Sequence, residues 1–351
     1  MRLGLGIGID KTNIAAISGG LRARFLGTGT QYTQLGPITR QLTAAMTGDG
    51  TQATDLLVTK RFAPNYTGDG TMAASLFSYE YLLSGDGVAA AAYSIRSLNP
   101  DYTGALVLIR RSSDNAEKAF YPDSNNELSL TSEDGASTTL STWIGSDNGF
   151  VKTWYDQSGS ARNSTQTTTS AQPKIITAGV LNTNNGKAAL NTDGSNSFFV
   201  FNSFATSGMA LIAAGNNTGY GTIISGGDDV SNRFDYGPRI INSYRYFVAE
   251  SGSNDTLDSG TNVLSNYLYE AYKDSGTFGY TYLNASVESS GTMAYDLQAY
   301  TNTNKLFTRN FGGGNSDYIA GDWNEIIIFA NDQTSNRATI ESNINTFYSI
   351  Y

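Results

Sequence analysis

The chain has 351 residues, of which only 15% are charged, and its formal net charge at pH 7 is −9. It contains no cysteine and no histidine. These absences exclude disulfides, thiolate metal sites, cysteine nucleophiles and Ser-His-Asp hydrolases. The negative charge argues against a nucleic-acid partner, because such binding needs Lys and Arg to neutralise phosphates. We therefore expect no cofactor and no metal, and any catalysis would use carboxylates, Tyr or Lys.

The N-terminus alternates small and apolar residues in Met1-Arg-Leu-Gly-Leu-Gly-Ile-Gly-Ile-Asp10. This pattern predicts an extended strand with no side chains along the side that carries the glycines. Such a strand can add to the sheet of a neighbouring protein through backbone hydrogen bonds. The apolar stretch is short and lacks an Ala-x-Ala cleavage site, so we expect no secretory signal. No segment approaches the roughly 18 apolar residues of a membrane span. We expect residues 1–20 to bind a larger assembly, and residues 1–78 to form an anchoring or oligomerisation segment.

Three similar turns follow in the chain, at Thr47-Gly-Asp-Gly-Thr51, Thr67-Gly-Asp-Gly-Thr71 and Ser84-Gly-Asp-Gly87. Asp-Gly pairs favour tight turns, because Gly adopts positive φ at little steric cost. Their spacing is irregular, about twenty and then about seventeen residues, which argues against a solenoid repeat. Each turn also has too few carboxylates for a calcium loop. We interpret all three as turns only.

Residues 79–351 form a succession of short apolar runs separated by Gly, Asn, Asp and Ser. This pattern, almost without helical periodicity, predicts two packed antiparallel sheets. The expected strands are Ala105–Arg111, Phe150–Tyr155, Lys174–Thr177, Phe198–Phe201, Ala210–Ala214, Thr222–Ser225, Tyr244–Ala249, Tyr267–Lys273, Phe278–Leu283 and Glu325–Phe329.

One helix is expected at the C-terminus, capped by Thr334 or Ser335. Apolar residues recur there at helical spacing and predict one stripe that packs against the sheets. That stripe consists of Ile340, Ile344, Phe347, Tyr348 and Tyr351.

Two blocks of sequence resemble a known family. They are Gly149-Phe-Val-Lys-Thr-Trp-Tyr-Asp-Gln-Ser-Gly159 and Ala91-Ala-Tyr-Ser-Ile-Arg96, the latter followed by residues 102–115. Together they resemble the catalytic domain of the arabinofuranosidase B family. Gly321–Phe329 with the helix after it is similar to the last strand of laminin-G-like domains. The resemblance implies an all-β fold, a concanavalin-like jelly-roll sandwich of two antiparallel sheets with a C-terminal helix.

A sugar-site motif of that family is matched by Phe234-Asp-Tyr-Gly237. In the family two adjacent cysteines precede this motif, whereas Asn232 and Arg233 stand here. The disulfide that forms part of the family's sugar platform is therefore missing. The ligand contacts implied by the resemblance are Asp235, Tyr236, Tyr244 and Glu250.

Catalysis in that family needs a nucleophilic Glu and an acid, because a retaining glycosidase places two carboxyl groups about 5 Å apart. Glu250, in Phe247-Val-Ala-Glu250, is the nearest match to the nucleophile. The family's acid lies in Gly-Gly-Asp-Asn-Ser, but this chain has Gly312-Gly-Gly-Asn-Ser316, with Asp317 next. We therefore expect no enzyme activity, and Glu250 and Asp317 are the remaining catalytic candidates.

Each singled-out residue also has a simpler structural interpretation. Glu250 then ends a strand in solvent and Asp235 is a hydrogen-bonded turn residue. Trp154 and Tyr155 pack in the core and at its rim. Asp156 and Ser158 cap the turn that follows them.

The Met1–Gly8 stretch resembles the N-terminal arms of phage appendage proteins. With a degraded glycosidase-like sandwich and 22 tyrosines suited to adhesion, this predicts a virion structural protein. It would be a head-decoration, fibre or tail-associated subunit, a homotrimer made in the host cytoplasm, bound to other virion proteins and to a cell-surface glycan. The alternatives are a glycoside hydrolase acting on surface polysaccharide through Glu250 with Asp317 or Asp322, and an architectural capsid subunit.

Overall fold

The structure is a computed structural model in which the chain forms two compact units, Met1–Glu80 and Tyr81–Tyr351. The first unit is described only by its strand backbones. The described residues are 21–26, 32–35, 42–47, 53–56, 62–66, 71–76, 81–83, 89–204, 208–227, 233–240, 243–250, 253–259, 265–295, 304–311 and 314–351. The arm at residues 1–20 and the Asp-Gly pairs of the three turns lie outside them.

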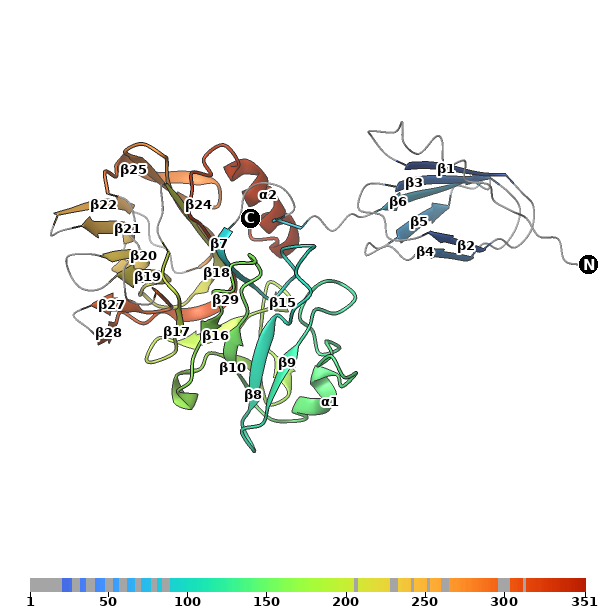
Figure 1. Ribbon diagram of the computed structural model, residues 1–351, viewed down its shortest axis with the longest axis horizontal. Coiled ribbons are helices and arrows are strands. Elements are labelled where there is room, and N and C mark those ends of the chain that lie inside the picture. The colour runs from blue at the N-terminus through green and yellow to red at the C-terminus, as the bar shows by residue number, and fades with distance from the viewer. Residues whose placement is uncertain are drawn as a thin grey trace, which may run out of the picture. The chain divides into compact units, whose positions relative to one another are not determined.

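The described residues of the first unit form six short strands in two sheets (Figure 1). The larger sheet has the order β1-β3-β6-β5, and β2 and β4 form the other. The pairs β1–β3 and β2–β4 are parallel, whereas β3–β6 and β5–β6 are antiparallel. The strands are β1 (Leu21–Leu26), β2 (Tyr32–Leu35), β3 (Leu42–Thr47), β4 (Ala53–Leu56), β5 (Phe62–Tyr66) and β6 (Thr71–Leu76).

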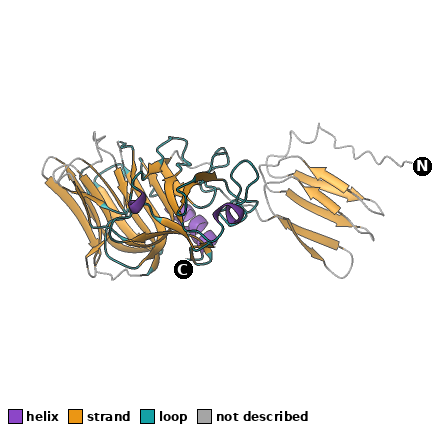
Figure 2. Ribbon diagram, turned by 90° about the horizontal axis from the view of Figure 1, so that it is seen from below, coloured by secondary structure: helices purple, strands orange, loops and turns teal. Residues whose placement is uncertain are grey.

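The second unit is a β-sandwich, and strands make up most of it in Figure 2. One layer, sheet A, has the order β25-β24-β23-β18-β29, with β7 and β16 both on the free side of β29. Its strands are β7 (Ala89–Ser94), β16 (Leu190–Asp193), β18 (Met209–Asn217), β23 (Asn266–Lys273), β24 (Phe278–Leu283), β25 (Ser286–Thr292) and β29 (Ala320–Phe329).

The other layer, sheet B, has the order β22-β21-β20-β19-β26-β17-β11-β10-β8-β9. β12 (Lys174–Thr177) pairs with both β10 and β16 and so joins the layers at one edge. The strands are β8 (Val107–Arg111), β9 (Glu117–Phe120), β10 (Gly149–Trp154), β11 (Ser164–Thr165), β17 (Phe199–Phe201), β19 (Ile224–Gly227), β20 (Arg233–Ile240), β21 (Ser243–Glu250), β22 (Ser253–Ser259) and β26 (Asn304–Leu306).

Short elements complete the unit. They are the helices α1 (Leu140–Ile144) and η2 (Thr169–Ala171), and the strands β13 (Val180–Leu181), β14 (Thr183–Asn184), β15 (Lys187–Ala188), β27 (Arg309–Phe311) and β28 (Gly314–Ser316). Every strand range expected from the sequence overlaps an observed strand, and the expected all-β sandwich is confirmed. No helix in the described ranges has the length and apolarity to cross a bilayer.

Large aromatic side chains fill the space between the layers. The rings of Trp154 and Phe307 are 6.4 Å apart and those of Phe307 and Trp323 are 5.5 Å apart, measured between centroids. All three are fully buried, so Trp154 is a core residue. A Cβ on Gly215 would lie 2.7 Å from the Trp323 ring, which explains the glycine in the middle of β18.

The turn after β10 is held by one buried carboxylate, Asp156. It accepts hydrogen bonds from the backbone N–H groups of Ala92, Ser158 and Arg162, each at 2.9 Å, and from the Ser158 hydroxyl at 2.8 Å. The capping role expected for Asp156 is confirmed. Because Ala92 lies on β7, this turn also ties sheet B to sheet A.

The C-terminal helix α2 (Arg337–Tyr348) covers the outer face of sheet A (Figure 1). Its buried apolar residues Ile340, Ile344 and Tyr348 lie on the expected stripe. The expected cap is wrong: the helix begins after Asn336, which makes no side-chain capping bond. Tyr351 lies beyond the helix end and is 51% exposed, so it is not part of the stripe.

Beneath α2 lies a buried ion pair between Arg96 and Glu325, whose side chains are 2% and 1% exposed. Arg96 donates two hydrogen bonds to Glu325, at 2.8 and 3.0 Å. The hydroxyls of Ser94 and Tyr348 donate to the same carboxylate at 2.8 and 3.0 Å. The Arg96 guanidinium also lies 4.7 Å from the Phe347 ring centroid. Both charges are therefore satisfied inside the protein.

Candidate ligand-binding site

A row of polar residues crosses the outer face of sheet B. Asp235 on β20 pairs with Ser225 on β19, and Ser225 pairs with Lys305 on β26. Residues paired across strands point to the same face, and their chain neighbours point to the other. The neighbours Tyr236, Ile224 and Leu306 are all fully buried among the aromatic core residues. The row therefore faces away from sheet A.

The local backbone at this row depends on Gly237, the last residue of the Phe234–Gly237 motif. It has a φ of 151°, and a Cβ there would lie 2.8 Å from the backbone nitrogen of Ile223. Any larger residue would push β20 away from the neighbouring chain segment. Gly237 is therefore needed for close packing at this position, and this packing keeps Asp235 in register with β19.

Asp235 is fully buried and lies between two arginines. The Arg233 Nε donates a hydrogen bond to Asp235 Oδ2 at 3.2 Å, and the Arg309 Nε lies 3.7 Å from the same oxygen. The Arg233 and Arg309 side chains are only 9% and 10% exposed. Arg233, which stands where the resembling family has a cysteine, therefore forms an ion pair with the motif's aspartate.

The hairpin β27–β28 carries the other half of the cluster. Arg309 Nη1 donates to Asp317 Oδ2 at 2.8 Å, so one guanidinium links buried Asp235 to the exposed carboxylate of Asp317. The Ser225 hydroxyl donates to the Thr308 carbonyl at 2.8 Å. These bonds fix the hairpin next to β19, and Figure 1 shows the two side by side.

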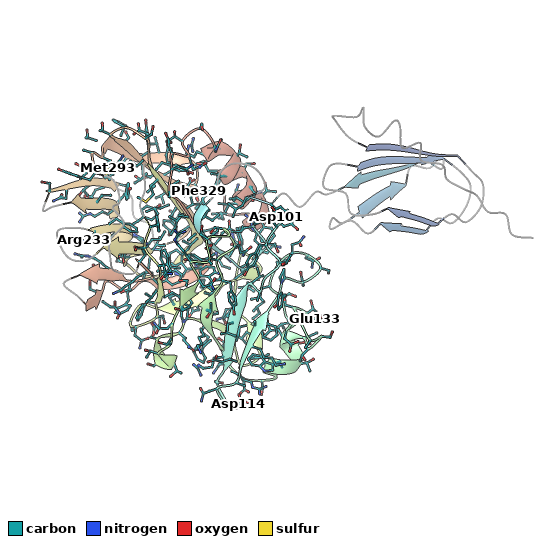
Figure 3. The ribbon with its side chains drawn as sticks, viewed as in Figure 1. Asp101, Asp114, Glu133, Arg233, Met293 and Phe329 are labelled. Carbon is teal, nitrogen blue, oxygen red and sulfur yellow. The ribbon has the colours of Figure 1, made fainter. Side chains whose placement is uncertain are left out.

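A third cation lies at the end of the row. The Lys305 ammonium donates to the Asn315 side-chain oxygen at 2.5 Å, and partial burial lowers the pKa of Lys305. In Figure 3 the label of Arg233 shows where these residues lie in the second unit, on the opposite side from Glu133 in that view. We call Arg233, Asp235, Lys305, Arg309 and Asp317 the Asp235 cluster.

The other residues implied by the resemblance occupy different places. Tyr236 is fully buried and its ring meets Tyr246 edge-on at 6.2 Å, so it belongs to the core behind the cluster. Burial raises the pKa of Tyr236 well above its usual value. Tyr244 and Glu250 lie on β21, but their side chains are outside the described part of the structure.

Strand register still constrains position 250. Phe247 is paired with Asp235, whereas Val248 and Tyr246 are paired with Phe234 and Tyr236. Position 250 has the same strand parity as 246 and 248, which is opposite to that of Asp235.

The remaining acidic candidate, Asp322, lies on β29 in sheet A, where its carboxylate accepts a hydrogen bond from Asn191 at 2.9 Å. Gly314 lies in β28 at the position of the family's acid. Among the described residues, no group of three or more acidic side chains is arranged to hold a metal ion.

Sequence reasoning identified Asp235 and Asp317 but missed their cationic partners Arg309 and Lys305. Only Arg233 carried a local signal, because Arg-x-Asp on one strand places both side chains on one face. Arg309 and Lys305 reach the cluster through pairings between distant segments, which no local pattern reveals.

Comparison with known proteins shows similarity in fold only. No family model and no curated protein matches this sequence. A GH54 α-L-arabinofuranosidase soaked with a cyclic sulfate inhibitor has 15% sequence identity and a TM-score of 0.53, over 73% of this chain and 62% of that chain. An arabinofuranosidase complexed with arabinofuranosyl-α-1,2-xylobiose has 16% identity and a TM-score of 0.45, over the same shares. The chain thus spans less than two thirds of these proteins.

A third structure is domain 4 of AbnA, a GH43 extracellular arabinanase from Geobacillus stearothermophilus, in complex with arabinotriose. It has 14% identity and a TM-score of 0.34, over 44% of this chain and 82% of that chain. At these identities the first structure supports the sandwich fold alone, and the weaker matches add no further argument.

Proposed function

We propose that the sandwich binds a glycan at the Asp235 cluster without cleaving it, and that the chain is a structural subunit of a virion appendage used for adhesion to the host surface. The observation that carries the glycan proposal is the polar row on the outer face of sheet B, beside a hairpin that supplies further charged groups. Hydroxyl-rich ligands need such convergent donors and acceptors.

The fold supports a sugar as the class of ligand. The structure with a TM-score of 0.53 is an arabinofuranosidase, which acts on a sugar. Within the cluster, Asp317 is an exposed acceptor and Lys305 is a partly exposed donor, so both are accessible for hydrogen bonds to ligand hydroxyls. Buried Asp235 and Arg233 hold the surface in place from below.

We propose no turnover because the family's acid is missing. Gly314 stands at its position, and the Asp317 carboxylate next to it is held by the Arg309 guanidinium at 2.8 Å. Asp235 is buried and ion-paired with Arg233. A retaining mechanism needs two carboxyl groups facing one sugar about 5 Å apart.

Glycan-array binding tests the ligand. We expect the full chain to bind a restricted set of glycans and Lys305→Ala to lose that binding by about tenfold, as for one charge-assisted hydrogen bond. Lys152→Ala is the matched control, because Lys152 is a similarly exposed lysine paired with Glu117 elsewhere on sheet B. A blank array with the protein present on purified particles would favour the architectural alternative.

Hydrolysis of a chromogenic arabinofuranoside tests the enzyme alternative. We expect no product above the level of a boiled control. Turnover that disappears in Glu250→Gln would show that the chain is a glycosidase and would overturn the proposal.

Mass spectrometry of purified phage particles tests the virion assignment, which we base on the N-terminal arm. We expect the chain among the particle proteins, and we expect a chain lacking residues 1–20 to fold but not to be incorporated. Incorporation of the shortened chain at the normal level would show that the arm is not the anchor.

A further inference from the structure

The first unit contains a sequence repeat that the three Asp-Gly turns only partly reveal. Gly27-Thr-Gly-Thr30, Gly48-Asp-Gly-Thr51 and Gly68-Asp-Gly-Thr71 each precede a leucine by the same interval. Those leucines are Leu35, Leu56 and Leu76. The period is about 20 residues, in the range of stacked repeat architectures. The expectation of irregular spacing arose from including Ser84–Gly87, which lacks both the threonine and the leucine.

The structure pairs the first two repeats strand for strand. In β1–β3, Leu21 is opposite Leu42, and in β2–β4, Tyr32 is opposite Ala53. Both parallel ladders therefore have the same shift, which is one sequence repeat. The interval in the sequence and the pairing of the backbones give the same register, so the repeat is a structural unit.

The third repeat does not continue this stack. β6 instead turns back on β5 with Phe62 opposite Leu76, and it pairs with β3 in the antiparallel direction. β5 contains Pro64, which cannot donate a backbone hydrogen bond and is typical of a protected edge. The third repeat thus closes one side of the larger sheet.

The remaining edges have no partner among the described strands. These are the outer edge of β1 and both outer edges of the β2–β4 pair. A parallel pair of four-residue strands is marginal alone, and parallel sheets normally occur covered and extended. Repeat units likewise need stacked neighbours to be stable.

We propose that residues 21–76 form a three-repeat assembly module in which the open edge of β4 pairs in parallel with the open edge of β2 in a second copy of this chain. The occupant is a second copy because its β2 can take the open side of β4 in the same one-repeat register that β2 and β4 already have within one chain. The edge of β1 cannot be extended in this way, because both sides of β3 are occupied. This deepens the assembly part of the proposed function and is independent of glycan binding.

The absence of native cysteine allows a clean cross-linking test in the full chain. Thr54→Cys on β4 and Thr33→Cys on β2 are made in separate chains and mixed, because the one-repeat register places Thr54 of one copy opposite Thr33 of the other. Thr177→Cys is the matched control, because Thr177 is exposed on β12 of the sandwich. Under mild oxidation we expect at least about tenfold more disulfide-linked dimer from this mixture than from Thr177→Cys, because pairing raises the effective thiol concentration.

Light scattering and hydrogen exchange on the unmodified chain complete the test. We expect a mass of two or more chains and slow exchange in 32–35 and 53–56 that is lost on dilution, while 209–217 stays protected. A single-chain mass at all concentrations, or equal cross-linking of the mixture and of Thr177→Cys, would overturn the proposal. Cross-linking with a blank glycan array would refute glycan binding alone, and glycan binding by a monomer would refute the assembly module alone.

Discussion

Two arginine–carboxylate clusters lie on the opposite outer faces of the sandwich, and they differ in how completely they are enclosed. Under α2, Arg96 donates two hydrogen bonds to Glu325, and two hydroxyls and an aromatic ring complete their surroundings. At the Asp235 cluster, Arg309 has one buried and one exposed carboxylate partner, and the Asp317 side chain is 35% exposed. The first cluster is closed to solvent, whereas the second leaves polar groups exposed.

The largest effect is expected from breaking the enclosed cluster. Glu325→Ala would leave Arg96 buried without its carboxylate, which typically costs about 3–5 kcal/mol. Urea unfolding followed by tryptophan fluorescence would measure the loss. Arg245→Ala, which removes a partly exposed pair with Asp258, should cost less than about 1 kcal/mol and serves as the control. Similar losses in both variants would contradict the distinction between enclosed and exposed pairs.

A smaller loss is expected in the Asp235 cluster. Asp235→Asn keeps the side-chain shape but weakens the interactions with Arg233 and Arg309, while Arg309 retains Asp317. The expected cost is about 1–3 kcal/mol, as for a weakened buried charged hydrogen bond. The same unfolding experiment measures it. A cost as large as that of Glu325→Ala would show that this cluster is equally important for the fold.

The α2 side should also respond to pH. Burial first, and then the neighbouring Glu341 carboxyl, raise the pKa of Glu270 well above its usual value, although the Tyr272 hydroxyl donates to Glu270 at 2.8 Å. Below the unfolded-state pKa of about 4.5, both states are protonated and the full contribution to stability is present. As pH rises, the unfolded chain ionises first, so stability falls until the folded-state pKa is passed.

Glu270→Gln removes this titration. The variant should unfold at a higher temperature than the natural chain at pH 7 and should lose this advantage near pH 4.5. Melting temperatures from pH 4.5 to 8 would show it. A temperature difference that is constant over that range would mean that Glu270 ionises normally in the folded chain.

The smallest effect on stability is expected at the exposed end of the Asp235 cluster. Asp317→Asn should change the free energy of unfolding by less than about 1 kcal/mol, because exposed ion pairs contribute little. It should nevertheless weaken glycan binding, measured by isothermal titration with a glycan from the array. Unchanged affinity would show that the exposed carboxylate is not a ligand contact.

The sequence predicted the sandwich because its signals are local. Lys174–Thr177 and Phe278–Leu283 have the observed bounds of β12 and β24, since apolar and β-branched or aromatic runs ending in turn residues define both. The polar strand β25 was not predicted, because its run Ser286–Thr292 has little apolar pattern and forms by pairing with β24. The cap of α2 was misplaced by one or two residues, a typical uncertainty at helix ends.

The candidate site was only half predictable for a related reason. The Asp235 position came from a four-residue motif, but Arg309 reaches it from a hairpin far along the chain. The burial of Tyr236 depends on Tyr246 and on sheet A. Such features arise from packing between sheets, so a local pattern cannot contain them.

The late position of β29 in the sequence affects how the sandwich folds during synthesis. It pairs with β18 along its length and with β7 and β16 on its other side, yet it begins only at Ala320. During synthesis, β7 and β18 therefore have no shared neighbour until β29 has left the ribosome, more than 100 residues after β18. Contacts of such long sequence separation form slowly, so the nascent sandwich is exposed to aggregation until the C-terminal segment emerges.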